Sequence, residues 1–160
     1  MTLSAWRIVK RNLSRTAFNG EGARLFGGRW NSPGVAMVYT AQSPSLAALE
    51  ILVHLDSPEL LKRYVVIEVG MDDSLIAHVN LADLPRNWQA DPSPVSLREI
   101  GDAWATEGRS VALRVPSAMV PMEHNFLLNP HHVDYSKLHV GKPVLFQFDP
   151  RLARERLARI

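Results

Sequence analysis

The alternation of hydrophobic and polar residues predicts strands in the first part of the chain. Trp6–Val9, Val35–Ala41 and Tyr64–Val69 are rich in β-branched and aromatic residues, which suit a pleated, half-buried surface. Arg11–Gly34 shows little periodicity and contains several glycines. We expect this segment to form a long ordered loop, and loops of this length in compact domains are usually functional.

An apolar helix is predicted after the second of these strands. Ser43 followed by Pro44 is typical of a helix start, because the Ser side chain caps the first turn and Pro fits the first helical position. We expect the helix over Ser45–Leu55 and its end at Asp56–Pro58. The apolar residues at helical spacing, which we expect to face the core, are Leu46, Leu49 and Val53.

The second half of the chain mixes both kinds of element. Val95–Thr106 is predicted as a helix with Gly108 near its C-terminal end, and the proline-rich Leu84–Pro94 before it as a surface loop. Met119–Leu128 is ambiguous, and Asp149–Pro150 is expected to begin a final short helix. Further strands are predicted at Ile76–Val79, Val111–Val115 and Pro143–Phe148.

This order of elements favours an α+β fold over a regular doubly wound sheet, because strands outnumber helices and several are consecutive. The 160 residues fit a single domain over 1–160. The absence of Cys excludes disulfides, thiolate metal sites and a Cys nucleophile. No apolar run approaches the roughly 20 residues of a membrane span, and the first residues do not resemble a signal peptide. We therefore expect a cytoplasmic protein without a membrane partner.

The basic residues at both ends of the sequence leave one question open, namely whether they form a binding surface. Lys and Arg number 18 against 16 Asp and Glu, a formal net charge of only +2. Arginines and lysines nevertheless cluster at both ends, and such runs are more often solvated faces than binding patches. The alternative is a surface for nucleic acid or an acidic partner. The clustered residues are Arg7, Lys10, Arg11 and Arg15 at the start, and Arg151, Arg154, Arg156 and Arg159 at the end.

Gly20–Gly34 is the most unusual segment. Its glycines let the backbone approach a ligand closely and present N–H groups to an anion, and Arg24 and Arg29 add planar donors that match phosphate oxygens. The spacing fits neither a Walker loop nor a dinucleotide fingerprint. Anion binding and a purely structural turn therefore both remain open.

Two further residues are candidates for chemistry. Glu50 is the only carboxylate in an apolar helix, one step round from Leu46 and Val53 on the flank of the expected core face. Such a carboxylate is either exposed, paired with an Arg, or placed for catalysis. Tyr39 is either a core aromatic or a stacking wall for a planar ligand.

Metal and serine-hydrolase chemistry are weakly supported. The chain has neither an H-E-x-x-H motif nor a thiolate, so we expect no metal. Ser117 lacks the G-x-S-x-G context of a nucleophile elbow. The histidines close in sequence that raise the metal question are His124, His131, His132 and His139.

Several short motifs, taken together and in order, resemble the RES domain, a family named for its Arg, Glu and Ser. The likeness runs from about Trp6 to Phe148 and places the family's residues at Arg29, Tyr39, Glu50 and Ser117, with Arg24 as a competing position for the Arg. The motifs are Gly27–Asn31, Val38–Thr40, Leu46–Glu50, Val115–Ala118 and Asn125–Pro130.

The resemblance implies an ADP-ribosyltransferase-like fold, with a split mixed or antiparallel sheet and flanking helices around an NAD⁺ cleft. It implies a bacterial toxin of a type II toxin–antitoxin system, blocked by an Xre-type antitoxin that covers the cleft and makes any DNA contact. NAD⁺ would be the substrate, cleaved at its nicotinamide–ribose bond. The acceptor of ADP-ribose would be water, phosphate or, slightly favoured, a protein.

The resemblance also implies roles for particular residues. Glu50 would stabilise the cationic ribose, Tyr39 would stack on nicotinamide, and Arg29 would bind the pyrophosphate or the ribose end. Ser117 would adjust the geometry by a hydrogen bond on the nicotinamide–ribose side. The further residues expected at NAD⁺ are Trp30, Asn31 and Asn125. A nucleic-acid-binding module and a non-catalytic interaction domain are the alternatives from other classes.

Overall fold

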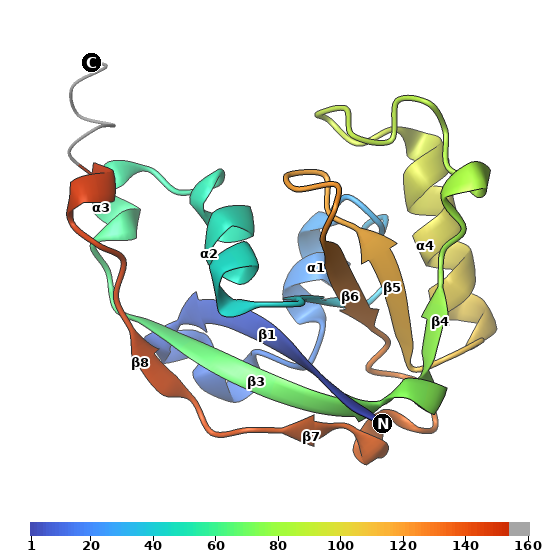
Figure 1. Cartoon of the computed structure of the whole chain (residues 1–160), viewed down its shortest axis with the longest axis horizontal. Helices are drawn as coiled ribbons and strands as arrows, with labels where there is room; N and C mark the ends of the chain where they lie inside the picture. Colours follow the sequence, from blue (N-terminus) through green and yellow to red (C-terminus); the bar gives the residue numbers. More distant parts are fainter. Residues whose placement is uncertain (154–160) are drawn as a thin grey trace.

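The computed structural model describes residues 1–153, which form one mixed sheet with helices on its faces (Figure 1). The strands are β1 (Thr2–Lys10), β2 (Val38–Ala41), β3 (Tyr64–Asp72), β4 (Ile76–His78), β5 (Ala112–Pro116), β6 (His124–Leu128), β7 (His139–Val140) and β8 (Val144–Phe146). The helices are α1 (Glu21–Phe26), α2 (Pro44–Leu52), α3 (Ser57–Leu60) and α4 (Val95–Glu107), with 3₁₀ turns η1 (Arg11–Thr16), η2 (Asp73–Leu75), η3 (Leu81–Asp83) and η4 (Tyr135–Lys137).

The sheet is split into two halves. Its strand order is β4-β5-β6-β2-β1-β3-β7, with β8 also pairing with β3, and only β4–β5 is parallel. β1 pairs with β3 along its whole length but meets β2 only at Trp6↔Ala41. The two halves therefore run in different directions (Figure 1). This arrangement confirms the predicted α+β fold with a split sheet.

Helices cover the two halves separately. α4 packs on the β5–β6 side, where Leu97 and Trp104 join Leu113 and Leu127 in one buried cluster. α2 packs where the halves meet, and Leu46 of α2 joins a second cluster with strand residues of β1 and β2. Helix α2 therefore packs on both halves of the sheet and lies beside the strand ends of the β5–β6 half.

The segment Arg11–Gly34 is not the long loop that its lack of periodicity predicts, because it contains η1 and α1. Neither element has a buried residue, so no hydrophobic stripe marks it in the sequence. Glycines at both ends of α1 take positive φ, 75° at Gly20 and 74° at Gly27, which favours glycine. The glycines therefore delimit a short helix and the turn that follows it.

The helix predicted after β2 is shorter than expected, and it turns a different face towards the core. Ser43 does cap it by accepting a hydrogen bond from Leu46 N. The prediction that Leu49 and Val53 face the core is wrong, since they are 37% and 51% exposed. The buried residues are Leu46 and Ala47. Positions three or four residues further on share this inward face, which places Glu50 on it rather than on its flank.

The expected stop at Asp56–Pro58 instead begins a second short helix, α3, in which Asp56 accepts a hydrogen bond from Glu59 N. The other elements lie close to their predicted positions. β1 and β3 extend further than predicted, β2 begins at Val38 rather than Val35, and β7 was not predicted. Most of the predicted C-terminal helix lies outside the described residues.

The N-terminal basic cluster is not one surface, because Arg7 is half-buried and its guanidinium is bonded within the protein. Its guanidinium donates to Ala17 O at 2.7 Å and Tyr39 O at 2.9 Å, and burial lowers its pKa. Lys10 and Arg11 lie at the surface beyond it. Within residues 1–153, no helix has the length and apolar character needed to cross a membrane.

Candidate active site

Glu50 reaches from the inward face of α2 to the ends of two strands. Its Oε1 accepts hydrogen bonds from Ser117 Oγ at 2.6 Å and from Asn125 Nδ2 at 2.9 Å. No hydrogen bond within residues 1–153 is made to its Oε2. The carboxylate is therefore fixed through one oxygen, and the other is available to a ligand. We call Glu50, Ser117 and Asn125 the carboxylate cluster.

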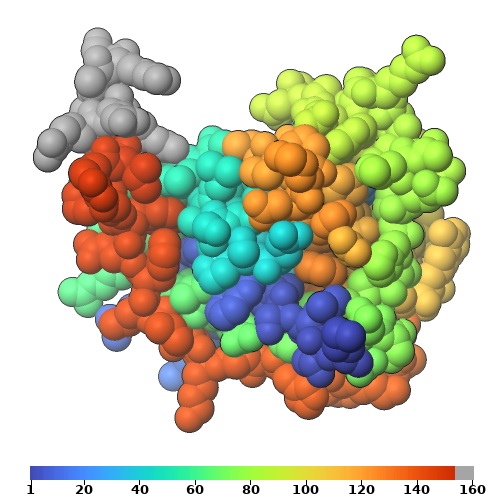
Figure 2. Space-filling model, viewed as in Figure 1, coloured from blue at the N-terminus to red at the C-terminus, as the bar shows by residue number. Residues whose placement is uncertain are grey.

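Ser117 follows the last residue of β5 and is fully buried. Its hydroxyl donates to Glu50 and accepts from Met119 N and Val120 N, each at 3.1 Å. The same hydroxyl thus holds the β5–β6 turn and orients the carboxylate. Figure 2 shows the surface of α2 and of this turn in contact. All the hydrogen bonds of the Ser117 hydroxyl in the described part of the chain are made within the protein.

Asn125 lies at the start of β6 and donates to Glu50 through Nδ2. Its Oδ1 is buried and has no hydrogen-bond partner in the described part of the chain. Rotating the amide would place Oδ1 against the carboxylate, so the orientation is set by charge. A buried acceptor without a partner destabilises a protein by about 1–3 kcal/mol.

The predicted anion-binding segment forms a tight turn around Arg29, which we call the arginine loop (Gly27–Gly34). Gly28 and Asn31 are bridged across the turn. The fully buried Asn31 donates through Nδ2 to Ala23 O at 2.8 Å and Val35 O at 3.0 Å. A side chain at Gly28 would lie 2.6 Å from the Tyr39 hydroxyl, so this position requires glycine.

Tyr39 holds the arginine loop from β2. Its hydroxyl donates to Asn31 Oδ1 at 2.6 Å and accepts from Trp30 N at 3.0 Å. Burial raises the pKa of the Tyr39 phenol, which therefore stays protonated as the donor; Asp102 raises this pKa further, and Arg29 opposes the shift. Arg29 and Asp102 thus lie within electrostatic reach of the phenol.

Arg29 is tied to the proline-rich loop at 84–94. Its Nη1 donates to Trp88 O at 3.0 Å and Ala90 O at 2.9 Å, while its own carbonyl accepts from Ser93 Oγ at 2.7 Å. The same loop reaches the β5–β6 turn, where Gln89 Nε2 donates to Ala118 O at 3.3 Å. The loop therefore links the arginine loop to the turn that carries Ser117.

The register between β2 and β6 places Tyr39 and Asn125 on the same face of the sheet. Tyr39 pairs with Leu127, and Ala41 pairs with Asn125. Because paired residues and residues two apart share a face, Tyr39 and Asn125 are diagonal neighbours, about 7–8 Å apart. The carboxylate cluster and the arginine loop thus border one region at the ends of β2, β5 and β6.

The structure brings Glu50, Ser117 and Asn125 into direct contact. Tyr39 lies on the same face of the sheet as Asn125, and Arg29 is connected to the β5–β6 turn through the 84–94 loop. Trp30 and Asn31 are 2% and 0% exposed and bind within the protein. Their contact with NAD⁺ stays a prediction. Within residues 1–153, no group of three or more His, Asp or Glu is arranged to hold a metal ion.

Sequence reasoning missed α4 as part of this site. Asp102 Oδ1 accepts from Ser32 N at 2.8 Å, and a Cβ at Gly101 would lie 1.8 Å from Trp30 O. α4 therefore packs directly on the backbone of the arginine loop. The only signal in the sequence is a glycine inside an otherwise regular helix, which usually marks a close approach.

Comparison with known proteins decides the family. The RES domain matches residues 4–149 of the chain. The chain belongs to the RES domain family. The motifs around Arg29, Tyr39, Glu50 and Ser117 thus come from a likeness that covers nearly the whole domain.

Curated relatives of this RES domain are similar along their full length. It is 41% identical to "Toxin Res" of Yersinia enterocolitica, over 92% of this chain and 97% of that protein. It is also 41% identical to the "Prs ADP-ribosylating toxin" of Sphingobium sp., over 97% and 99%. The "Toxin Res" of Photorhabdus laumondii is 36% identical over 94% and 97%.

The fold of this RES domain is similar to a solved structure, a chain of the M. tuberculosis MbcT–MbcA toxin–antitoxin complex. The TM-score is 0.75, and the match covers 99% of this chain and 90% of that chain. The sequences are 21% identical, so this likeness supports the fold.

Replacing Ser117 by alanine is expected to lower the turnover of this site by up to about 100-fold, because Glu50 loses its shortest donor and shifts position. The backbone N–H groups of Met119 and Val120 also lose their acceptor, and the two lost hydrogen bonds together lower the free energy of unfolding by about 1–3 kcal/mol. Steady-state kinetics and thermal unfolding measure the two effects. Ser74→Ala, which removes an exposed hydroxyl, is the control. A lower unfolding temperature with unchanged kcat would leave Ser117 a purely structural role.

Proposed function

We propose that this RES domain is the toxin of a toxin–antitoxin system, binds NAD⁺ and cleaves its nicotinamide–ribose bond. The observation that carries the proposal is the Glu50 carboxylate, anchored through Oε1 by Ser117 and Asn125 with no hydrogen bond to Oε2 among the described residues. Relatives named as Res toxins and as an ADP-ribosylating toxin support it.

The chemistry of NAD⁺ requires such a carboxylate and little else. Nicotinamide is cationic while bound to ribose and leaves as a neutral molecule, so its departure needs no proton. Positive charge builds on the ribose, as it does in glycoside cleavage, where carboxylates stabilise the transition state. Because Glu50 is already oriented, it stabilises this charge without reorganisation.

Asn125 complements Glu50 in this proposal. Its buried Oδ1 lacks a donor within residues 1–153 and lies on the amide that binds the carboxylate. Because the fold itself covers Oδ1, Asn125 would act on the nicotinamide riboside through Glu50, whose carboxylate it orients.

Tyr39 and Arg29 supply the binding side. The Tyr39 ring is half-buried on the same sheet face as Asn125 and would form a stacking wall for nicotinamide. The hydrogen bonds of Arg29 to Trp88 and Ala90 both use Nη1, so Nε and Nη2 remain for the pyrophosphate. NAD⁺ would thus bind without releasing the 84–94 loop.

The acceptor of ADP-ribose is proposed to be a protein, and a relative that matches 97% of this chain, the "Prs ADP-ribosylating toxin", supports this choice. Water and inorganic phosphate are the alternatives. Incubating the purified chain with adenine-labelled NAD⁺ and cell lysate is expected to give labelled protein bands and free nicotinamide. Release of nicotinamide with label only in ADP-ribose or ADP-ribose phosphate would identify water or phosphate instead. Intact NAD⁺ would contradict the whole proposal.

The partner is proposed to be an Xre-type antitoxin that covers the site, in the cytoplasm. The structural neighbour was solved as a toxin–antitoxin complex, which supports a partner of this kind. DNA contact would then pass through the antitoxin. The hydrogen bonds of Arg7 to Ala17 O and Tyr39 O weaken the alternative of a nucleic-acid-binding module built on the N-terminal arginines.

A further inference from the structure

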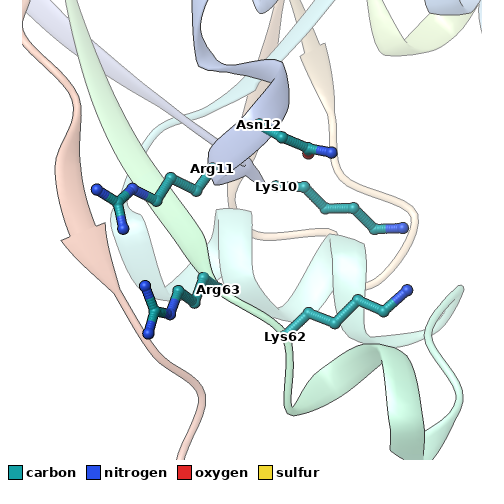
Figure 3. A pocket seen from close by; sticks show the side chains of 5 residues that line it. All are labelled: Lys10, Arg11, Asn12, Lys62 and Arg63. Atoms are coloured by element: carbon teal, nitrogen blue, oxygen red, sulfur yellow. The ribbon is translucent and has the colours of Figure 1, made fainter.

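A basic hollow lies where β1 ends and β3 begins. It has a volume of about 520 Å³ and is lined by Lys10, Arg11, Asn12, Lys62 and Arg63 (Figure 3). Trp6, which pairs with Ala41 of β2, lies four residues before Lys10 on β1, so the hollow is roughly 13 Å further along the strand. It is therefore separate from the carboxylate cluster.

The two lysines of the hollow share one carboxylate. Glu59 Oε2 pairs with Lys10 Nζ at 2.5 Å, and Glu59 Oε1 pairs with Lys62 Nζ at 2.5 Å. Hydrogen bonds from Lys10 and Lys62 lower the pKa of Glu59. One carboxylate between two ammonium groups leaves this trio of side chains with a net charge of +1.

The two arginines face each other without such a partner. Arg11 N donates to Arg63 O at 2.9 Å, which extends the β1–β3 ladder one residue beyond Lys10↔Tyr64. Neither guanidinium has an ion pair within residues 1–153. Like charges opposite each other in a strand pair are destabilising, so an anion bound between them would relieve a repulsion.

The directions of the side chains limit the ligand. Arg11 and Arg63 point to one side of the strand junction, and Lys10 and Lys62 point to the other (Figure 3). A single phosphate would reach only one pair of cations. An anion that engages both must be elongated and carry negative charge at each end. Guanidinium forks match phosphate oxygens in particular, because they donate two parallel N–H groups.

We propose that the basic hollow binds a chain of two or three condensed phosphates, either inorganic or in a nucleoside di- or triphosphate. The volume is typical of a small-molecule site. Among the described residues, no aromatic side chain lines the hollow, so it lacks the base stacking by which proteins bind single-stranded nucleic acid. The ligand is therefore a small polyphosphate rather than a nucleic acid.

Isothermal titration of the purified full-length chain with inorganic triphosphate tests the proposal. Triphosphate is expected to bind at least about tenfold more tightly than orthophosphate. The variant Arg11→Gln/Arg63→Gln should weaken triphosphate binding by about tenfold or more, since two charge-assisted contacts are lost. The matched control, Arg15→Gln/Arg98→Gln, removes the same charge outside the hollow and should change the affinity less than about twofold.

Further measurements distinguish an inorganic phosphate chain from a nucleotide as the ligand, and the proposal from its alternatives. Equal affinities for triphosphate and ATP indicate that the phosphate chain is the ligand, and tighter ATP binding indicates a nucleotide. The Arg11/Arg63 variant should keep the wild-type kcat/KM for NAD⁺; a loss would overturn the proposal by making the hollow part of the NAD⁺ site. Equal weakening in both double variants, tighter binding of orthophosphate, or binding of duplex DNA without triphosphate would also overturn it.

Discussion

Replacing Glu50 by glutamine is expected to slow the release of nicotinamide from NAD⁺ by about two to three orders of magnitude. Glutamine has the same shape, and its Oε1 still accepts from Ser117 Oγ and Asn125 Nδ2. The negative charge is lost, and an NH₂ group replaces the second carboxylate oxygen. Since that charge acts on the cationic transition state, kcat should fall while KM for NAD⁺ changes little.

The measurement is nicotinamide release under saturating NAD⁺, with circular dichroism to show that the variant is folded. Glu99→Gln is the matched control, because Glu99 is an exposed carboxylate of α4. It should keep wild-type turnover. If Glu50→Gln retained wild-type kcat, Glu50 would not be the catalytic carboxylate. A fall in both variants would point to a general effect of net charge.

Gly101→Ala is expected to be among the most destabilising substitutions in the chain. The added Cβ would lie 1.8 Å from Trp30 O and 2.8 Å from Trp30 C, and these are backbone atoms that no side-chain rotation moves away. α4 or the arginine loop must shift. Overpacking of this kind costs about 3 kcal/mol or more, which corresponds to a fall in the unfolding temperature of about 6–12 °C.

Gly22→Ala is the control for this substitution. Gly22 also lies in a helix, α1, and a Cβ there meets no atom within 4 Å. Alanine at this position should stabilise the protein slightly, by up to about 1 kcal/mol. Differential scanning calorimetry compares the two. Equal unfolding temperatures for both variants would show that α4 does not contact the arginine loop as described.

Gly101→Ala should also raise the KM for NAD⁺, because Trp30 adjoins Arg29 and the displaced backbone moves the guanidinium. This separates two ways of losing activity. Glu50→Gln affects the chemical step in a folded protein, whereas Gly101→Ala affects binding through the shape of the loop. A KM for NAD⁺ that stayed at the wild-type value in folded Gly101→Ala would remove Arg29 from the binding role.

Elements with strong local signals could be predicted from the sequence. The Ser43–Pro44 cap marks the start of α2, and Gly108 ends α4 in the left-handed conformation. α1 and η1 could not be predicted, because they bury no residue and therefore carry no hydrophobic period. The predicted orientation of α2 was also wrong. In a helix that is apolar nearly all round, spacing alone does not select the inward face.

The site shows a similar division. Glu50 stands out in the sequence as a lone carboxylate in an apolar helix, and family motifs add Arg29, Tyr39 and Ser117. What the sequence could not show is that Ser117 and Asn125 both bind the same oxygen of Glu50. These contacts join residues 67 and 75 positions apart, and they depend on how α2 rests on the sheet.

The single β1–β2 pair at Trp6↔Ala41 has a mechanical consequence. With only one pair to resist it, rotation of one half-sheet against the other meets less opposition there than anywhere else in the ladder. Glu50 sits on a helix packed across this hinge, while its two donors belong to the β5–β6 half. A change of angle at this pair would therefore change the spacing between the carboxylate and its donors, and a partner bound across both halves would hold that spacing fixed.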